Sequence, residues 1–168
     1  MNIYDLQPTC PNSGTVAEQV LHHFNDDTAR TVYVSDVEFP YPDGALIVSR
    51  TDTRGIITHA NEAFVNISGW SREEIIGAPH AILRHPHMPK VAFADLWATV
   101  QRGDRWVGYV KNRRKDGGFY LVHATVLPNV RQGKVIGYSS IRRKPCRTQV
   151  AEAEALYAAM RAQEDSHV

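Results

Sequence analysis

The sequence predicts an α+β domain, in which a five-stranded antiparallel sheet carries short helices on one face and helical extensions flank it at both ends. Two short β-branched segments come first, several short helical segments follow, and three longer strands with tight turns come last. Strands joined by hairpin turns pair antiparallel, and the helices between them collect on one face. With 168 residues and 43% hydrophobic side chains, the chain is long enough for one such domain with extensions.

The first 42 residues are expected to form an extension outside the domain. Thr15 is a suitable cap for a short helix. The apolar face of that helix consists of Val16, Val20, Leu21 and Phe24. We expect the helix to pack on the domain, with a homodimer as the alternative. The β-branched and aromatic segment 31–37 predicts a short strand.

The domain itself is expected over residues 43–145, because the prolines and turn residues of segment 39–44 interrupt any regular element. Its first two strands, at 45–50 and 56–59, are close enough in sequence to pair as a hairpin. An antiparallel meander ends the domain, and its strands are expected at 105–113, 119–130 and 134–143.

Helices separate these two groups of strands. Asn61 begins the first helix, and Ser71 with Glu74 forms a capping box for the second. A single turn is expected at 80–84, and Pro89 suits the first position of a longer helix. The residues of the longer helix that we expect to face inward are Val91, Phe93, Ala94, Leu96, Trp97 and Val100. 

A final helix is expected within residues 146–168, after Pro145 has ended the sheet. Thr148 is its expected cap. The apolar side of this helix carries Val150, Ala153, Leu156, Tyr157 and Met160. We interpret it as a signalling helix that leads out of the domain.

Charge and apolar pattern exclude two classes of partner. The 19 Lys and Arg against 18 Asp and Glu leave a net charge of +1, which gives no general attraction to nucleic acid. No apolar run approaches the roughly 18 residues of a membrane span, and the first residues do not resemble a signal peptide. We therefore expect a soluble, cytoplasmic protein. We expect Cys10 and Cys146 to be reduced thiols, with a disulfide as the alternative.

One long motif resembles a known domain family. The stretch Asp52–Gly77 reads DTRGIITHANEAFVNISGWSREEIIG, and together with the order of elements it resembles the PAS domains. Such domains bind haem, flavins, small acids or no ligand, so the function has to be argued from the site.

A narrower resemblance points to the FAD-binding PAS domain of Aer-type aerotaxis receptors. It rests on LRHPHMPK at 83–90, AFADLW at 92–97, WVG at 106–108 and VKNRRKDG at 110–117. The match covers residues 43 to about 145, nearly the whole domain. The resemblance implies a non-covalently bound FAD whose redox state is sensed in aerotaxis or energy taxis.

The resemblance also implies which residues form the flavin pocket. They are Asn61, Arg84, His85, Trp106 and Asn112. Two further positions depart from the family pattern. The family motif usually reads HPDMP, and here His87 takes the acidic position; Thr125 stands where an asparagine is frequent. We keep both as candidate cofactor-binding residues.

Three of these residues also suit FAD on physical grounds. Trp106 offers an aromatic wall for the ring, and the Asn112 amide offers both a donor and an acceptor for its edge. Arg84, shortly before a helix start, suits the pyrophosphate. Without the resemblance, the simpler interpretations are a core tryptophan, a strand-end amide and a loop arginine.

Two other functions fit a PAS domain. His80, His85 or His87 as a haem ligand would make it a gas sensor, whereas a pocket filled by side chains would make it a cofactor-free interaction module. The spacing of these histidines does not suit a tetrahedral metal site. We interpret the basic run 111–115, with residues 142–144 beside it, as a solvated edge of the sheet rather than a nucleic-acid surface, with a docking surface for a signalling partner as the intermediate alternative.

The sequence presents no catalytic set: no placed Ser/His/Asp group, no paired carboxylates and no phosphate loop. We therefore expect a sensory module and not an enzyme. The resemblance implies that its partner is a signalling protein or the signalling region of a receptor, which in the family includes a HAMP domain.

Overall fold

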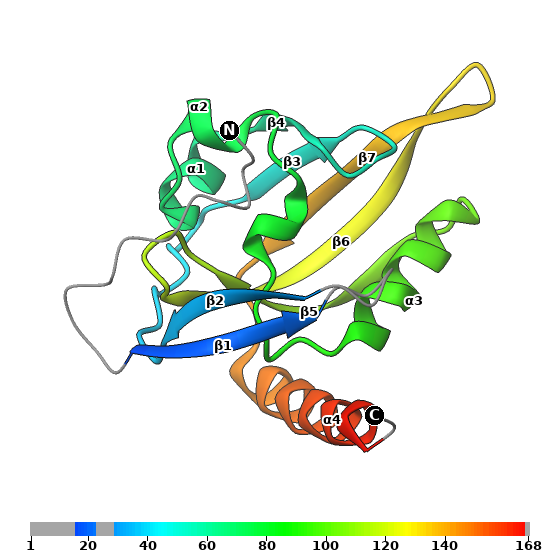
Figure 1. Ribbon diagram of the computed structural model, residues 1–168. Coiled ribbons are helices and arrows are strands. Elements are labelled where there is room, and N and C mark those ends of the chain that lie inside the picture. The colour runs from blue at the N-terminus through cyan, green and yellow to red at the C-terminus, as the bar shows by residue number, and fades with distance from the viewer. Residues whose placement is uncertain (1–15, 23–28, 167–168) are drawn as a thin grey trace.

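The computed structural model describes residues 16–22 and 29–166, and its centre is a five-stranded antiparallel sheet (Figure 1). The strands lie side by side in the order β4-β3-β7-β6-β5. Their bounds are β3 (Ile47–Thr51), β4 (Ile57–Ala60), β5 (Trp106–Arg113), β6 (Phe119–Arg131) and β7 (Lys134–Arg143). The α+β class and the closing meander that the sequence predicts are confirmed.

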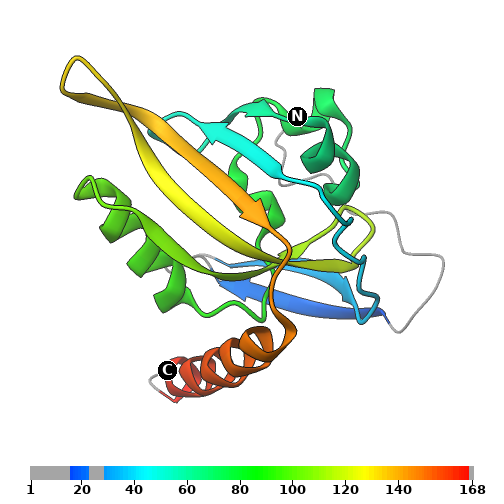
Figure 2. The same cartoon turned by 180° about the vertical axis from the view of Figure 1, so that it is seen from behind.

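The helices between β4 and β5 lie on one face of this sheet, which Figures 1 and 2 show from opposite sides. They are α1 (Glu62–Ser68), α2 (Arg72–Ile75), the 3₁₀ helix η2 (His80–Leu83) and α3 (Lys90–Gln101). The helix predicted to begin at Asn61 is α1, and the structure shows that Asn61 caps it: its Oδ1 accepts a hydrogen bond from the backbone N–H of Phe64 at 3.1 Å. The capping box of Ser71 and Glu74 is also present.

The last helix, α4 (Arg147–Asp165), packs beside β5. The Tyr157 hydroxyl donates to the carbonyl of Tyr109 at 3.0 Å. Near its end, Glu164 accepts from the backbone N–H groups of Lys90 and Val91 at 3.2 and 2.9 Å, so its carboxylate caps α3. The expected cap Thr148 is wrong, because the helix begins two residues after Pro145 and places Cys146 at the cap, without a side-chain bond.

The N-terminal extension corrects one prediction. Residues 16–22, expected to be helical, form strand β1 (Val16–His22), which pairs antiparallel with β2 (Ala29–Ser35). A helix this short is marginal in water, whereas a neighbouring strand satisfies the backbone of the whole segment. The predicted strand at 31–37 is confirmed as β2. The rest of the predicted helix, its cap Thr15 and residues 23–24, lies outside the described residues.

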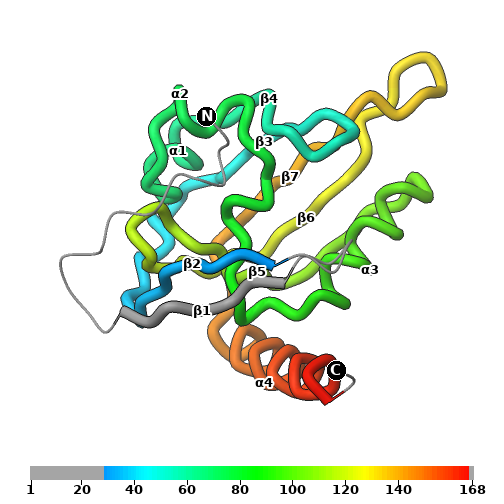
Figure 3. The backbone as a smooth tube through the Cα atoms, viewed as in Figure 1, coloured from blue at the N-terminus to red at the C-terminus, as the bar shows by residue number. Residues whose placement is uncertain are grey.

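The chain after β2 runs along the turn that joins β5 and β6, as the backbone path shows (Figure 3). The N–H of Ser35 donates to the carbonyl of Gly117 at 2.8 Å, and the N–H of Phe39 donates to that of Phe119 at 2.7 Å. These bonds fix the N-terminal hairpin to the sheet, so the extension is part of the folded unit.

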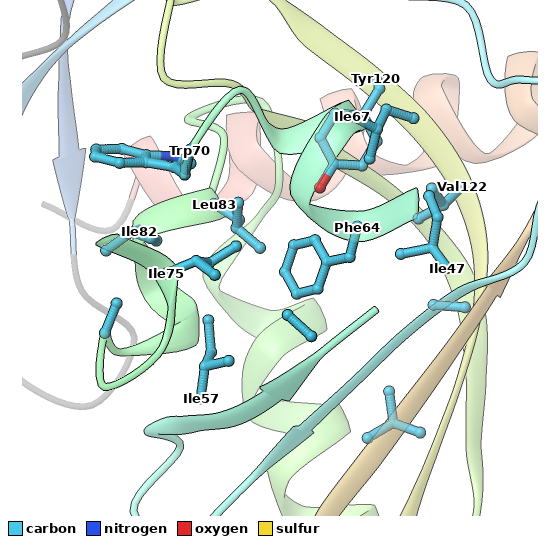
Figure 4. Close-up of a cluster of buried hydrophobic side chains, with 14 of the residues drawn as sticks. Ile47, Ile57, Phe64, Ile67, Trp70, Ile75, Ile82, Leu83, Tyr120 and Val122 are labelled. Carbon is cyan, nitrogen blue, oxygen red and sulfur yellow. The ribbon is translucent and has the colours of Figure 1, made fainter. Parts of the chain in front are cut away.

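The core lies between the inner face of the sheet and the helices (Figure 4). Its members that are at most 1% exposed include Ile47, Ile57, Phe64, Ile67, Ile75, Leu83, Val100, Tyr120 and Val122. Val91, predicted to face inward, is 48% exposed. The reason is helical geometry: at 100° per residue it lies roughly 160° around α3 from Phe93, which faces the sheet.

Gly137 is a position where the sheet requires glycine. A Cβ added there would lie 2.1 Å from the carbonyl oxygen of Thr51 on the neighbouring strand β3. We expect Gly137→Ala to lower the free energy of unfolding by about 1–3 kcal/mol or more, because the two backbones must separate. Urea unfolding measures this, with Ile136→Ala as the control, since Ile136 is 53% exposed. Equal losses in both variants would contradict the prediction.

Candidate ligand-binding cavity

A cavity of about 630 Å³ lies between helix α3 and the inner face of the sheet. Val110 and Ala124 belong to its sheet wall, and Phe93 and Leu96 belong to its helix wall. Residues of η2 and of the turn after β3 complete the lining. The volume falls within the usual range for sites that bind small molecules, about 300–1,000 Å³.

An aromatic pair forms part of the wall. The rings of Trp97 on α3 and Tyr138 on β7 meet edge to face, with centroids 5.3 Å apart and an angle of 83° between their planes. Gly55 packs beside this tryptophan, and its φ of +83°, which side chains rarely adopt, favours glycine at that position. The sequence indicated Trp97 only as an inward-facing core residue. Its spacing of four residues from Phe93 placed both rings on one face of α3.

Arg84 and Asn112, both predicted site residues, meet in the wall of the cavity. Each is 5% exposed, and their backbones form an isolated β-bridge. The Arg84 guanidinium lies 4.6 Å from the centroid of the Phe93 ring. Burial lowers the pKa of Arg84 to about 10, although the carboxylate of Glu164 acts in the opposite direction. The guanidinium is therefore charged at neutral pH.

Arg142, Ser49 and His80 form a second polar part of the wall. The sequence indicated only His80 among them, as a haem ligand in an alternative function. Arg142 is 1% exposed, donates from Nη2 to the hydroxyl of Ser49, and stacks 4.4 Å from the centroid of the Phe64 ring. Ser49 Oγ also lies 3.4 Å from Nε2 of His80. Burial, followed by the charge of Arg142, lowers the pKa of His80 to about 3, so this imidazole is neutral.

The cavity has a positive electrostatic character. Arg54, Arg84 and Arg142 belong to its lining, whereas no Asp or Glu does among the residues that the structure describes. Arg54 is 79% exposed and pairs with Asp52, so its charge is largely screened. Arg84 and Arg142 are buried and act at lower dielectric. This wall suits a ligand that carries negative charge or several hydrogen-bond acceptors.

Three predicted site residues lie off the wall. Asn61 uses its side chain to cap α1 and to bond the backbone of β3, where Nδ2 donates to the carbonyl of Leu46 at 2.7 Å. Trp106 is buried on the inner face, and its Nε1 donates to Asp95 at 2.9 Å. Thr125 alternates with the cavity residue Ala124 along β6 and therefore points to the opposite face of the sheet.

His85 and His87 lie beside the cavity, on the loop between η2 and α3. His85 is 1% exposed, and its Nδ1 accepts from the N–H of His87 at 3.0 Å. Burial and then the nearby Lys111 lower the pKa of His85 to about 2 and that of His87 to about 4. Nζ of Lys111 lies 3.0 Å from Nδ1 of His87, so a neutral histidine is compatible with this cation where an Asp would form an ion pair.

The basic run at 111–115 is not uniformly solvated, which corrects the prediction that it forms a solvated edge of the sheet. Arg113 is 4% exposed, and Arg142, expected to extend the run, is 1% exposed. Strand alternation explains the difference, because Arg142 follows an outward residue of β7 and turns into the core. Arg143 and Lys144 remain exposed.

Three further features of the described chain concern membrane spans, metal ligands and cysteines. Across residues 16–22 and 29–166, none of the helices combines the length and the apolarity that a bilayer crossing requires. Within the same part of the chain, no three His, Cys, Asp or Glu side chains gather closely enough to hold a metal ion. Cys146 is exposed and reduced, whereas Cys10 lies outside the described residues.

The buried histidines predict a dependence of stability on pH. His80 is neutral when folded but takes up a proton near pH 6.5 when unfolded, so the unfolded state binds more protons between pH 6.5 and about 3. The free energy of unfolding should therefore fall as the pH falls through this window. Its slope from one histidine is about 1.4 kcal/mol per pH unit.

Urea unfolding of the ligand-free protein at pH 7 and at pH 5 measures this effect. His80→Gln should reduce the loss of stability between the two pH values by about 1–2 kcal/mol. His59→Gln, at an exposed strand position, is the matched control and should leave the loss unchanged. The same pH dependence in wild type and His80→Gln would show that this imidazole is not held neutral.

Comparison with known proteins agrees with the fold and with the motif. The family described as the PAS fold matches residues 57–142. The aerotaxis receptor of Escherichia coli (strain K12) is 47% identical over 130 residues, which are 77% of this chain and 26% of that protein. The nitrogen fixation regulatory protein of Klebsiella pneumoniae is 30% identical over 100 residues, 59% of this chain and 20% of that protein.

The chain thus spans about a quarter of the length of the first relative and a fifth of the second. Among solved structures, a PAS domain of a protein from Colwellia psychrerythraea superimposes with a TM-score of 0.55 at 23% identity, over 60% of this chain and 86% of that one. This likeness concerns the fold. The resemblance to Aer-type receptors is confirmed by the first relative, and the chain belongs to the PAS fold family.

Proposed function

We propose that this chain binds FAD non-covalently in the cavity between α3 and the sheet and reports its redox state in signal transduction, as a sensor for aerotaxis or energy taxis. The observation that carries the proposal is the cavity itself, with buried Arg84 and Asn112 in its wall and no carboxylate among its described lining residues. The similarity to an aerotaxis receptor supports the same function.

The wall offers what each part of FAD needs. The rings of Trp97 and Tyr138 and the aliphatic residues of the sheet suit a flat apolar ring. The Asn112 amide suits the polar edge of that ring, since it both donates and accepts. Arg84 suits the pyrophosphate, because a guanidinium binds phosphate oxygens in a fork. A bound flavin supplies the redox chemistry, which the side chains of the protein do not.

The other predicted residues support the site from outside the wall. His85 and His87 shape the loop that carries Arg84. Trp106 fixes α3 to β5 through Asp95, and Asn61 fixes α1 to β3. We propose that these four act by holding the wall in place. Thr125, on the opposite face, has the weakest support as a cofactor contact.

Strand β5 connects the site to the last helix. Asn112 lies three residues from Tyr109, whose carbonyl accepts from Tyr157 and whose hydroxyl donates to Gln149, both on α4. A change of hydrogen bonding at Asn112 on reduction would therefore bias the docking of α4. We propose that a signalling protein or a receptor signalling region reads this helix in the cytoplasm, and that the chain is a sensor and not an enzyme.

The absorption spectrum of the purified protein tests the proposal. We expect the two bands of an oxidised flavin at roughly 370 and 450 nm, and we expect them to bleach on reduction. Pigment released by heat should be FAD rather than FMN. A Soret band would instead indicate a haem sensor with a ligand such as His80. A colourless protein that does not take up added FAD would indicate a cofactor-free interaction module.

A further inference from the structure

Arg142 is a buried cation without a counter-ion. It is 1% exposed, and no carboxylate of the described residues lies within ion-pair distance of it. Its only hydrogen bond from the guanidinium goes to the neutral hydroxyl of Ser49, and Nε and Nη1 have no partner among the described residues. Such an arrangement is costly, because a buried charge needs a partner to offset its loss of hydration.

The position of Arg142 suggests what that partner is. The residue lies in the wall of the cavity beside Ser49 and His80, and both of these are uncharged at neutral pH. Burial lowers the pKa of Arg142 to about 10, so the guanidinium keeps its charge under ordinary conditions. Phe64 on its other side contributes only a ring face. The cavity is therefore the place from which a missing acceptor can come.

We propose that Arg142 is the charge partner of the ligand: its guanidinium holds a carbonyl or anionic group of the flavin ring and binds the ring more tightly once reduction has made it negative. The inference rests on the proposed function and deepens it. Two electrons from dithionite, which is oxidised to sulfite, and one proton from water convert the oxidised ring into a reduced ring with one negative charge. By linkage, tighter binding of the reduced form raises the reduction potential of the bound flavin.

Arg142 and Arg84 differ in how far the protein itself offsets their charge. Arg84 lies near the start of α3 and is coupled electrostatically to Glu164, so part of its charge is already offset within the protein. Arg142 has no such carboxylate among the residues that the structure describes. A negative charge that appears on the ligand on reduction is therefore attracted most strongly by Arg142, whose positive charge no nearby carboxylate of the described residues offsets.

Anaerobic titration of pigment-free protein with FAD tests the inference, in the oxidised state and after reduction by dithionite. In Arg142→Met we expect the affinity for oxidised FAD to fall about 10-fold and that for reduced FAD about 100-fold. The ring bound to this variant should take up a second proton on reduction, so the midpoint potential should depend more steeply on pH. Arg143→Met, the exposed neighbour on the same strand, is the matched control and should behave as wild type.

A second measurement separates a ligand role from a structural one. Without FAD, Arg142→Met should be at least as stable as wild type to heat, because the substitution removes an unpaired buried charge. Arg142→Lys keeps the charge and loses the fork, so it should bind oxidised FAD more weakly and still prefer reduced FAD. This variant carries the test if Arg142→Met does not fold.

The outcomes are distinct. If Arg142→Met binds oxidised FAD and reduced FAD as tightly as wild type does, the role of Arg142 is overturned while the proposed function stays intact. A ligand-free Arg142→Met that folds but is markedly less stable than wild type, with unchanged preference for reduced FAD, would assign the residue to the core instead. A wild-type protein that binds FAD in neither state would overturn the proposed function and this inference together.

Discussion

Arg84→Ala should give folded, colourless protein. Arg84 is 5% exposed and lies in the cavity wall, where its guanidinium stacks on Phe93, so the substitution takes the main candidate partner of the pyrophosphate out of the site. A hydrogen bond to a charged group contributes about 1.5–3 kcal/mol, which corresponds to a loss of affinity of roughly 10- to 100-fold. Flavin occupancy after purification, read from the ratio of visible to ultraviolet absorbance, measures the loss.

The control for this variant is Arg102→Ala. Arg102 caps the far end of α3, its side chain is 61% exposed, and it pairs with Asp104 at 3.4 Å outside the cavity. We expect this variant to keep its flavin, and we expect the circular dichroism spectra of both variants to match wild type. Full flavin occupancy in Arg84→Ala would remove this residue from the site. A loss of flavin in both variants would point to α3 as a whole instead.

The elements of the domain could be predicted because their signals are local. The capping box at Ser71 and Glu74, the Asp116-Gly117 turn and the β-branched runs each determine a few residues of backbone, and the structure agrees with all three. The N-terminal segment could not be predicted in this way. Its apolar residues fit a helix, and only pairing with β2 makes Val16–His22 a strand.

The residues of the cavity also differ in whether a local sequence signal identifies them. Arg84 and Asn112 belong to motifs of the resemblance, which identified them, and the structure brings them together in one wall. Arg142 and Ser49 come from β7 and β3, and nothing local distinguishes them. His80, from η2, was indicated only as an alternative haem ligand. Arg142 even precedes two exposed basic residues, so its burial follows only from the alternation of β7 and from its place between Ile47 and Ala124 in the sheet.

Phe64→Ala should be the most destabilising of the substitutions considered. The ring is 0% exposed at the centre of the core (Figure 4), and it supports the guanidinium of Arg142 at 4.4 Å. Truncation of a buried phenylalanine costs about 3–5 kcal/mol, because the loss of buried surface adds to the cavity that remains. For a chain of this length the midpoint of thermal unfolding should fall by roughly 10 °C.

Phe39→Ala is the matched control, because Phe39 is 41% exposed and lies outside the buried core, with Arg114 stacked 4.1 Å from the centroid of its ring. We expect it to cost below about 1 kcal/mol. Both variants should be measured after removal of pigment, since a bound ligand adds its own stabilisation to the folded state. Similar losses for the two phenylalanines would mean that the core is not centred on Phe64. A large loss for Phe64 alone, together with weakened FAD binding, would show that the core positions Arg142 as well as holding the fold.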